Sequence, residues 1–288
     1  MSKKVKKTST KKTKTLPANW AWLGRTRLLA GGLFILSVLL YANTFSHDFA
    51  QDDAIVITEN MFTTEGVAGI PGLFQYDTFY GFFKVEGKAK LVAGGRYRPL
   101  TPAMFAVEYS LFGAKPGGMH LFNALWYGLT VVMLYLLLLT IFQSRKSWDS
   151  QISLLGIYWI PLLAAFLFAV HPLHTEAVAN IKGRDEIITL LGSLTSLWLL
   201  FKGGTLRTAL AGVCFFLALL AKENAITFLG VAPLALFVFT QTKISDIIKR
   251  ISPLLAATVV FLIIRGAILG WDAGPPSQEL MNNPFLKL

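Results

Sequence analysis

The feature that most constrains this chain is a succession of long apolar runs between residues 22 and 269. A helix needs about 20 mostly apolar residues to cross the roughly 30 Å hydrocarbon core of a bilayer. Inside that core, only helices and closed barrels satisfy their own backbone polar groups. The chain is 54% hydrophobic and 15% charged, whereas about 25% of the residues in soluble domains are charged. The sequence therefore predicts an all-α protein, a polytopic transmembrane helical bundle.

The apolar runs predict about seven transmembrane helices, separated by polar segments of unequal length. We place these helices at about 22–41, 119–142, 152–170, 187–201, 206–221, 226–239 and 251–269. The first connection, 42–118, is the longest and is rich in aromatic residues, glycine and proline. Within it, the apolar residues of 102–112 predict a helix at the membrane interface. Because long connections usually carry function, we expect chemistry in this one.

Basic residues predict the orientation of the bundle. Seven lysines lie among residues 1–21, a segment too poor in apolar groups to fold alone. We therefore predict a disordered cytoplasmic tail, followed by a membrane domain at 22–288. Later basic clusters at 145–146, 202–207 and 243–250 fall on the same side if the helices alternate. The opposite, extracytoplasmic face would be in the bacterial periplasm or, in a eukaryote, the lumen of the endoplasmic reticulum.

Two other interpretations of the N-terminal region were weighed. Lysines also neutralise nucleic-acid phosphates, but a basic flank before a first hydrophobic helix explains them better, so we predict no nucleic-acid partner. The first apolar run could instead be a cleaved signal peptide. A helix extended back over Trp20 and Trp22 would give a full span with an aromatic interface belt, which favours a retained helix.

Two adjacent acids, Asp52 and Asp53, follow the first predicted helix almost directly. Such a pair is most often only a solvated part of a loop. At a membrane interface, however, desolvation and mutual repulsion raise the pKa of one carboxyl toward the range useful for a general base. We therefore predict that Asp52 and Asp53 are the catalytic acids, and leave open which of them is the base.

Cations that suit a phosphate group lie further along the chain. Pro99 biases Arg98 away from helix, so Arg96 and Arg98 would lie along one side of an extended strip. Guanidinium forks match phosphate oxygens well, although these two could equally contact lipid headgroups. Lys222 has a neighbouring acid, Glu223, and the two could simply neutralise each other. The other candidate cations are Lys182 and Arg184.

One short motif contains possible metal ligands. His174 and Glu176 could ligate a divalent cation such as Mg²⁺ or Mn²⁺, or hydrogen-bond a substrate. Their two-residue spacing is a weak metal signature, and a lone histidine is more often a cap or core residue. The candidate metal ligands are therefore Asp53, His174 and Glu176. The sequence has no G-x-G-x-x-G motif or P-loop that would cradle a soluble nucleotide.

Four motifs follow one another between Tyr41 and Thr227: YANTFSHDFAQDD, YRPLT, HPLHTEAVANIKGRDE and AKENAIT. In this order they resemble the transmembrane and tetratricopeptide-repeat O-mannosyltransferases, the TMTC family, and their bacterial relatives. That family is part of the GT-C superfamily of membrane glycosyltransferases. The resemblance implies a GT-C-like fold and a lipid-linked donor, a polyprenyl- or dolichyl-phosphate sugar. The sugar would pass to a hydroxyl of a protein, glycan or lipid acceptor.

Carried over to this sequence, the resemblance implies that Asp52 or Asp53 acts as the base. His174 and Glu176 become candidates for contacts to the donor or to a metal. The candidates for binding the lipid phosphate are Arg96, Arg98, Lys182, Arg184 and Lys222. The sequence shows no tetratricopeptide repeat, so we expect either a fragment of a longer protein or a minimal seven-helix core.

Two other functions would use the same features. A transporter or flippase of a lipid-linked substrate would bind with these cations without making a bond, and it predicts broken helices and charges at the bilayer midplane. A non-catalytic membrane scaffold would bind a partner through 42–118 and would tolerate loss of the acids. The residues identify neither the sugar, the acceptor nor the oligomeric state.

Overall fold

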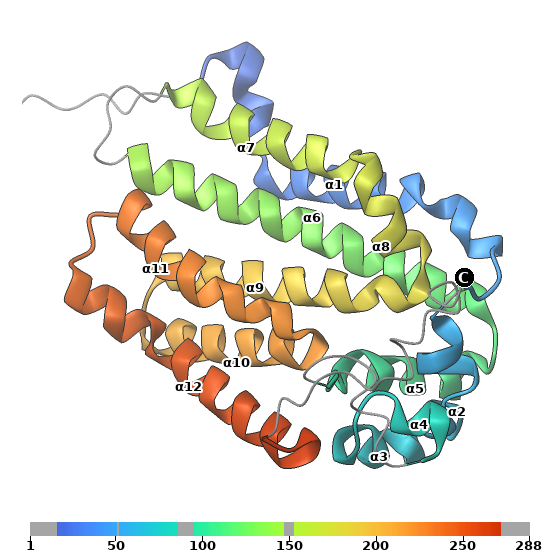
Figure 1. Cartoon of the computed structure of the whole chain (residues 1–288). Coiled ribbons are helices and arrows are strands. Elements are labelled where there is room, and N and C mark those ends of the chain that lie inside the picture. Colours follow the sequence, from blue (N-terminus) through green and yellow to red (C-terminus); the bar gives the residue numbers. More distant parts are fainter. Residues whose placement is uncertain (1–15, 51, 86–94, 147–152, 272–288) are drawn as a thin grey trace, which may run out of the picture.

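The computed structural model describes residues 16–50, 52–85, 95–146 and 153–271, and every regular element in this part of the chain is helical. The long helices are α1 (Thr26–Leu40), α5 (Leu100–Phe112), α6 (Pro116–Lys146), α7 (Leu154–Ala169), α9 (Arg184–Lys202), α10 (Thr205–Ala221), α11 (Phe228–Phe239) and α12 (Ile244–Leu269). The all-α prediction is confirmed. In Figure 1 these helices run alongside one another, except that α5 lies with the short helices at one end of the bundle.

The short elements gather at that end. They are η2 (Ala42–Ser46), η3 (Ala54–Thr58), α2 (Met61–Thr64), η4 (Gly66–Gly69), α3 (Ile70–Gln75), α4 (Tyr80–Phe83), η6 (Pro172–His174), α8 (Thr175–Ala179), η7 (Ile181–Gly183) and η8 (Glu223–Thr227). One further short helix, η1 (Ala18–Gly24), precedes α1. The long connection after α1 therefore folds into short helices that pack against α5, as its turn-forming residues predict.

The core of the bundle consists of two apolar clusters. One lies between α1, α6 and α7 and contains Tyr127, Val131 and Ala165. The other lies mainly between α9, α10 and α12 and contains Phe215 and Phe261. The central α6 packs against both α1 and α9, which joins the two clusters into one body.

Glycines allow these helices to approach one another closely. A Cβ atom at Gly128 of α6 would lie 2.8 Å from the ring of Phe34 in α1, and one at Gly212 of α10 would lie 2.8 Å from Pro253 in α12. A Cβ at Gly192 of α9 would lie 2.9 Å from the Cys214 carbonyl oxygen. Small residues at helix contacts are typical of membrane bundles, in which association depends on close packing.

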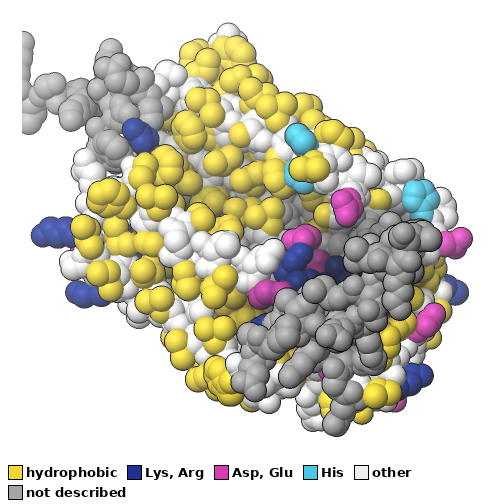
Figure 2. Space-filling view, viewed as in Figure 1, with side chains coloured by type: hydrophobic (Ala, Val, Ile, Leu, Met, Phe, Trp, Pro, Cys, Tyr) yellow, Lys and Arg dark blue, Asp and Glu magenta, His cyan; other side chains and the backbone are white. Residues whose placement is uncertain are grey.

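The membrane prediction is supported in part by helix length. Two helices, at Pro116–Arg145 and Ile244–Leu269, are long and apolar enough to cross a bilayer. The number rises to four if each bent pair is one span: η1 with α1, bent by 67°, and α7 with Pro172–Ala179, bent by 49°. Large apolar side chains are exposed on the outside of the bundle, for instance Leu234 at 63%. Figure 2 shows hydrophobic side chains over most of one face.

The predicted number of seven spans is not confirmed, although each predicted run is helical in the structure. α10 has 17 residues and α11 has 12, and a helix rises only about 1.5 Å per residue. The first run is not one continuous helix, since η1, which contains Trp20 and Trp22, is bent away from α1. The predicted disordered tail lies outside the described residues up to residue 15, and its last residues belong to η1.

Candidate functional site

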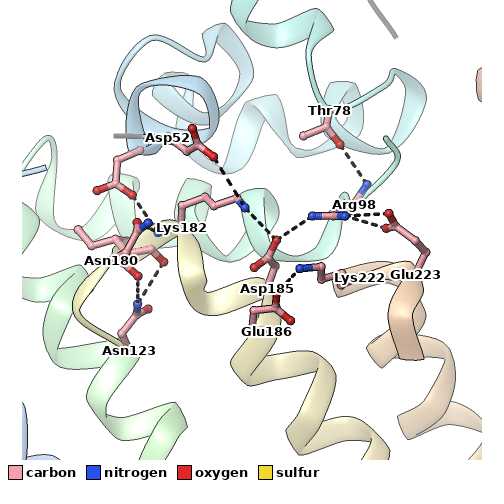
Figure 3. Close-up of polar contacts among 12 residues, drawn as sticks. Asp52, Thr78, Arg98, Asn123, Asn180, Lys182, Asp185, Glu186, Lys222 and Glu223 are labelled. Carbon is pink, nitrogen blue, oxygen red and sulfur yellow. Dashed lines mark hydrogen bonds and ion pairs between the residues drawn. The ribbon is translucent and has the colours of Figure 1, made fainter. Parts of the chain in front are cut away.

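A pocket at the short-helix end collects charged side chains from three distant parts of the chain. Asp52 comes from the loop after α1, Arg96 and Arg98 from the segment before α5, and Lys182 and Asp185 from η7 and α9. Figure 3 shows Arg98 and Lys182 both pointing toward Asp185. The remaining lining residues are Ile55, Val56, Thr78, Thr101, Pro102 and Phe105. The structure thus brings predicted acids and predicted cations together.

The segment before α5 is fixed by hydrogen bonds on both sides of its backbone. The Thr78 amide donates to the Arg96 carbonyl oxygen at 3.0 Å, and the Arg98 amide donates to the Thr78 hydroxyl at 3.2 Å. The Tyr97 hydroxyl donates to the Phe74 carbonyl oxygen at 3.0 Å. Side chains alternate along an extended segment, so Tyr97 is buried while Arg96 and Arg98 line the pocket. This confirms the prediction that both arginines lie on the same side of an extended strip.

Arg98 is held by two acids. Its Nε and Nη2 atoms lie 2.8 and 2.7 Å from the two carboxylate oxygens of Glu223, and its Nη1 lies 3.1 Å from Asp185 Oδ2. Burial alone would raise the pKa of Glu223, but the hydrogen bonds and charge of Arg98 hold that pKa below its ordinary value. A bidentate carboxylate–guanidinium pair of this kind fixes orientation as well as charge, so Arg98 joins the start of α9 to η8.

Arg96 differs from Arg98 in its surroundings. Its guanidinium lies 5.2 Å from the centre of the Phe79 ring, and the structure shows no ion pair for it among the residues it describes. Burial and the nearby charge of Arg98 both lower the pKa of Arg96. Of the two arginines, Arg96 is therefore the one whose charge is more open to an incoming anion.

Lys182 joins the two acids of the pocket. Its Nζ lies 3.4 Å from Asp185 Oδ2 and 3.9 Å from Asp52 Oδ2. Its backbone amide donates to Asp53 Oδ1 at 2.8 Å and to Asn180 Oδ1 at 3.2 Å. The main chain of Lys182 is thus anchored, while its ammonium group lies over the pocket between Asp52 and Asp185 (Figure 3).

The adjacent acids Asp52 and Asp53 have different environments. The side chain of Asp52 is 52% exposed and lines the pocket. Asp53 is 1% exposed, and its carboxylate accepts hydrogen bonds from the amides of Ala50 at 2.9 Å and Lys182 at 2.8 Å. Burial raises the pKa of Asp53, whereas these two hydrogen bonds lower it. The expected upward shift is present, but its main cause is burial, and the repulsion from Asp52 is a smaller cause.

Arg184 does not line the pocket. It is 0% exposed and forms an ion pair with Glu108 of α5. Its Nε donates to Asn123 Oδ1 at 2.7 Å, and its Nη2 donates to the Met119 carbonyl oxygen at 2.9 Å. The guanidinium also lies 4.4 Å from the centre of the Phe105 ring. Arg184 therefore ties α9 to α5 and α6 behind the pocket, where it has no access to a lipid phosphate.

Lys222 also lies away from the pocket lining. Its ammonium group pairs with Glu186 of α9, not with its sequence neighbour Glu223, which pairs with Arg98. The predicted pairing of Lys222 with Glu223 is therefore wrong, and the acid that neutralises Lys222 is Glu186. Lys222 and Glu186 join the end of α10 to the first turn of α9 beside the pocket (Figure 3).

The three candidate metal ligands do not converge. His174 Nδ1 lies 3.0 Å from the Tyr127 hydroxyl and 2.9 Å from the Phe168 carbonyl oxygen, which makes it a cap at the end of α7. Asp53 is occupied by two backbone amides. Glu176 lines a neighbouring pocket. Within the described residues, no group of three or more His, Cys, Asp or Glu side chains could hold a metal ion. These residues do not fit the expected ion, whose involvement stays a prediction.

Two acids of the site were not selected from the sequence. Asp185 and Glu223 both adjoin predicted cations in the motifs GRDE and AKENAIT, and both prove to be partners of Arg98. One signal was available for Asp185. It lies three residues after Lys182, a spacing that brings side chains together on a helix. Glu223 carried no comparable signal, because its partner is 125 residues away in the chain.

Comparison with known proteins finds relatives along most of the chain. The chain is 31% identical over 270 residues to protein O-mannosyl-transferase TMTC2 from Homo sapiens. The aligned region covers 86% of the chain and 30% of that protein. It is 32% identical over 225 residues to TMTC1 from Mus musculus, covering 72% of the chain and 21% of the relative. For TMTC4 from Homo sapiens the identity is 27% over 304 residues, with coverages of 93% and 39%.

The chain therefore spans between 21% and 39% of the length of these three curated relatives. No family model and no solved structure matches it.

Proposed function

The chain belongs to the TMTC-type family of protein O-mannosyl-transferases, and on this basis we propose that it is the membrane part of a glycosyltransferase. The proposed reaction moves a sugar from a polyprenyl-phosphate donor to a hydroxyl of a protein acceptor. The names of the relatives point to mannose as this sugar. The reaction takes place on the extracytoplasmic side. The observation that carries this proposal is the single pocket lined by Asp52, Arg96, Arg98 and Lys182.

The cations of this pocket suit a lipid phosphate. The phosphodiester of a polyprenyl-phosphate sugar carries one negative charge, and its leaving group gains another as the bond to the sugar breaks. Fixed positive groups that face this developing charge lower the barrier to departure. Arg96 and Lys182 are the groups placed for this role, because Arg98 already holds Glu223 and Asp185. Arg98 then acts as the fixed centre that keeps Asp185 beside Lys182.

Asp52 is the acid placed to act as general base. In the proposed step, the acceptor oxygen forms a bond to the anomeric carbon while the bond from that carbon to the phosphate oxygen breaks. The acceptor proton passes to the Asp52 carboxylate, and the lipid phosphate departs with the bonding electrons. Such a base must lie within hydrogen-bond reach of the hydroxyl, directly or through one water molecule. Asp52 is half exposed in the pocket, whereas both oxygens of Asp53 already accept backbone hydrogen bonds.

The extracytoplasmic location follows from the positive-inside rule. The pocket lies at the end of the bundle opposite to the one where α9 ends and α12 begins, with Lys202 in the last turn of α9 and Lys249 near the start of α12. Basic residues near the ends of membrane helices favour the cytoplasmic side. The short-helix end with its pocket would then face the periplasm or lumen, where an acceptor in the secretory route is accessible.

The test is transfer of a radiolabelled sugar from a polyprenyl phosphate to a Ser/Thr peptide by membranes that contain the chain. We expect Asp52→Asn to lower the rate by at least about a hundredfold, the lower range of general base catalysis. Glu59→Gln is the matched control, since Glu59 is an exposed acid of the same loop that lines neither pocket. Undiminished transfer by Asp52→Asn would contradict the assignment.

A further inference from the structure

A second pocket, with a volume of about 410 Å³, shares Lys182 and Asp185 with the pocket described above. Its other walls come from the turn before α8, from α8 and from the start of α9. They are formed by Leu173, Glu176, Ala177, Asn180, Gly183 and Glu186. The shared Lys182 ammonium lies 3.9 Å from Asp52 Oδ2, so a group at this wall of the second pocket is close to the proposed base.

The two pockets differ in charge. The first has the additional cations Arg96 and Arg98, whereas Lys182 is the cation that the second shares with it. Besides this cation, the lining of the second pocket contains three acids: Glu176, Asp185 and Glu186. Figure 2 shows acidic and basic side chains gathered together toward the α8 end of a largely apolar face.

The three acids are not equally compensated. Glu186 pairs with Lys222, and Asp185 pairs with Lys182 and Arg98. Glu176 is exposed and forms no ion pair with any residue that the structure describes. The second pocket therefore has an uncompensated negative charge at Glu176, which an incoming cation would neutralise.

Asp185 supplies an independent sign of a ligand. The residue is 2% exposed, and while Oδ2 accepts from Arg98, its Oδ1 is buried without a hydrogen-bond partner. A buried carboxylate oxygen of this kind is costly, because it has lost its water without gaining a donor. Asp185 lines both pockets, so this oxygen belongs to a side chain that a bound ligand would contact.

Two apolar side chains, Leu173 and Ala177, also line the second pocket. Leu173 is 76% exposed. A pocket that combines acids, an unpaired hydrogen-bond acceptor and an exposed leucine matches a polypeptide segment better than a sugar, whose surface is mostly hydroxyl. A lysine or arginine side chain offers both a cation and an apolar stem.

We propose that the second pocket binds the acceptor polypeptide beside its reacting hydroxyl, and that Glu176 selects for a lysine or arginine near that hydroxyl. This inference rests on the proposed function, because it is the proposed transferase activity that gives the chain a polypeptide acceptor. It gives the chain a substrate preference: acceptor segments with a nearby cation bind better than otherwise identical acidic segments.

The test measures binding directly, so that it does not depend on sugar transfer. Fluorescein-labelled Ser/Thr peptides that differ only in one flanking residue, Lys, Gln or Glu, are titrated against the chain in nanodiscs by fluorescence anisotropy. We expect the Lys peptide to bind at least about fivefold more tightly than the Glu peptide, the scale of one partly exposed ion pair. Higher salt should reduce this ratio.

Variants of Glu176 distinguish the possible outcomes. Glu176→Gln should bring the ratio between the Lys and Glu peptides close to one, and Glu176→Lys should reverse it, whereas Glu59→Lys should leave it unchanged. A ratio of one in the unaltered chain, or a ratio that persists in both Glu176 variants, overturns the inference. Sugar transfer to the same peptides is then measured separately. Charge-selective binding without transfer would leave the peptide site standing and count against the proposed function.

Discussion

At the scale of single residues, the two adjacent aspartates have different roles. Asp52 faces the pocket and Asp53 anchors it: the Asp53 carboxylate accepts the amides of Ala50 and Lys182, which joins the loop after α1 to η7. The sequence predicted the pair as a site but could not separate its members. The separation depends on the position of the Lys182 amide, 129 residues away.

This difference predicts unequal effects of the two substitutions on stability. Asp53→Asn should lower the free energy of unfolding by about 1–3 kcal/mol, because the amide nitrogen of asparagine cannot accept a hydrogen bond and leaves one buried backbone amide unpaired. Asp52→Asn changes a half-exposed side chain and should stay within about 0.5 kcal/mol of the unaltered chain. Thermal unfolding in detergent measures both variants. Equal stabilities of the two would contradict the anchoring role of Asp53.

The pair of Glu223 and Arg98 predicts how stability depends on pH. The folded chain holds the pKa of Glu223 below its ordinary value of 4.5, so the unfolded chain binds this proton more readily. The pair therefore stabilises the fold above about pH 4.5, and this contribution is lost as the pH falls through the lower folded pKa. Glu223→Gln should lower the stability at neutral pH. It should also remove the part of the stability loss at low pH that comes from protonation of Glu223.

Unfolding midpoints measured between pH 3 and 7 would show this as a shallower pH profile for Glu223→Gln. The buried acid Asp53 has a raised pKa, so its effect on the pH dependence of stability has the opposite sign. Both chains contain Asp53, so the test is the difference between the profile of the unaltered chain and that of Glu223→Gln. Parallel profiles would mean that the pair does not couple folding to protonation.

Burial explains why Arg184, one of the two predicted cations outside the pocket lining, does not face the pocket. Arg184 lies in the same charged motif as Lys182, and its residue type alone cannot separate a phosphate ligand from a structural centre. Its burial is decided by Glu108, 76 residues earlier, and by α6 behind it. The shared direction of Arg96 and Arg98 could be predicted because a local rule applies. Proline and the alternation of side chains along an extended segment fix that direction.

At the scale of elements, apolar periodicity located the helices but not their geometry. Each predicted run is helical, and the predicted interfacial helix at 102–112 corresponds to α5 (Leu100–Phe112). The bends at Gly24–Thr26 and after Ala169 were not predicted, since they depend on what the neighbouring helices contact. The short lengths of α10 and α11 leave the number of spans below the predicted seven by length and composition.

Close helix contacts make a prediction at this scale. Gly212→Leu should destabilise the bundle by about 1–3 kcal/mol, because its side chain would enter the space of Pro253 and push α10 away from α12. Gly230→Leu in α11 is the control, since a Cβ atom there meets nothing within 4 Å. Thermal unfolding in nanodiscs should separate the two variants. Equal stabilities of the two variants would contradict the packing role of Gly212, because the higher helix propensity of leucine favours both helices alike.

At the scale of the whole molecule, the bundle brings together motifs that are far apart in sequence. The loop after α1, the segment before α5, the start of α9 and η8 all reach one end, where Arg98 and Lys182 join their acids. Alternation of the predicted helices placed the four motifs together, although the seven spans on which it rests are not confirmed. It could not show that two pockets share a wall at Lys182 and Asp185, because that requires the side chains themselves.

In the proposed function, a lipid phosphate binds where Arg96 and Lys182 meet Asp52. The most direct test is photocrosslinking of a diazirine-bearing polyprenyl-phosphate sugar to the chain in nanodiscs, with the modified peptides mapped by mass spectrometry. We expect crosslinks in 95–105 and 181–186, and a loss of at least about tenfold in Arg96→Ala, the cost of removing one charged hydrogen-bonding partner. Crosslinks confined to other segments, or labelling unchanged in Arg96→Ala, would contradict the account.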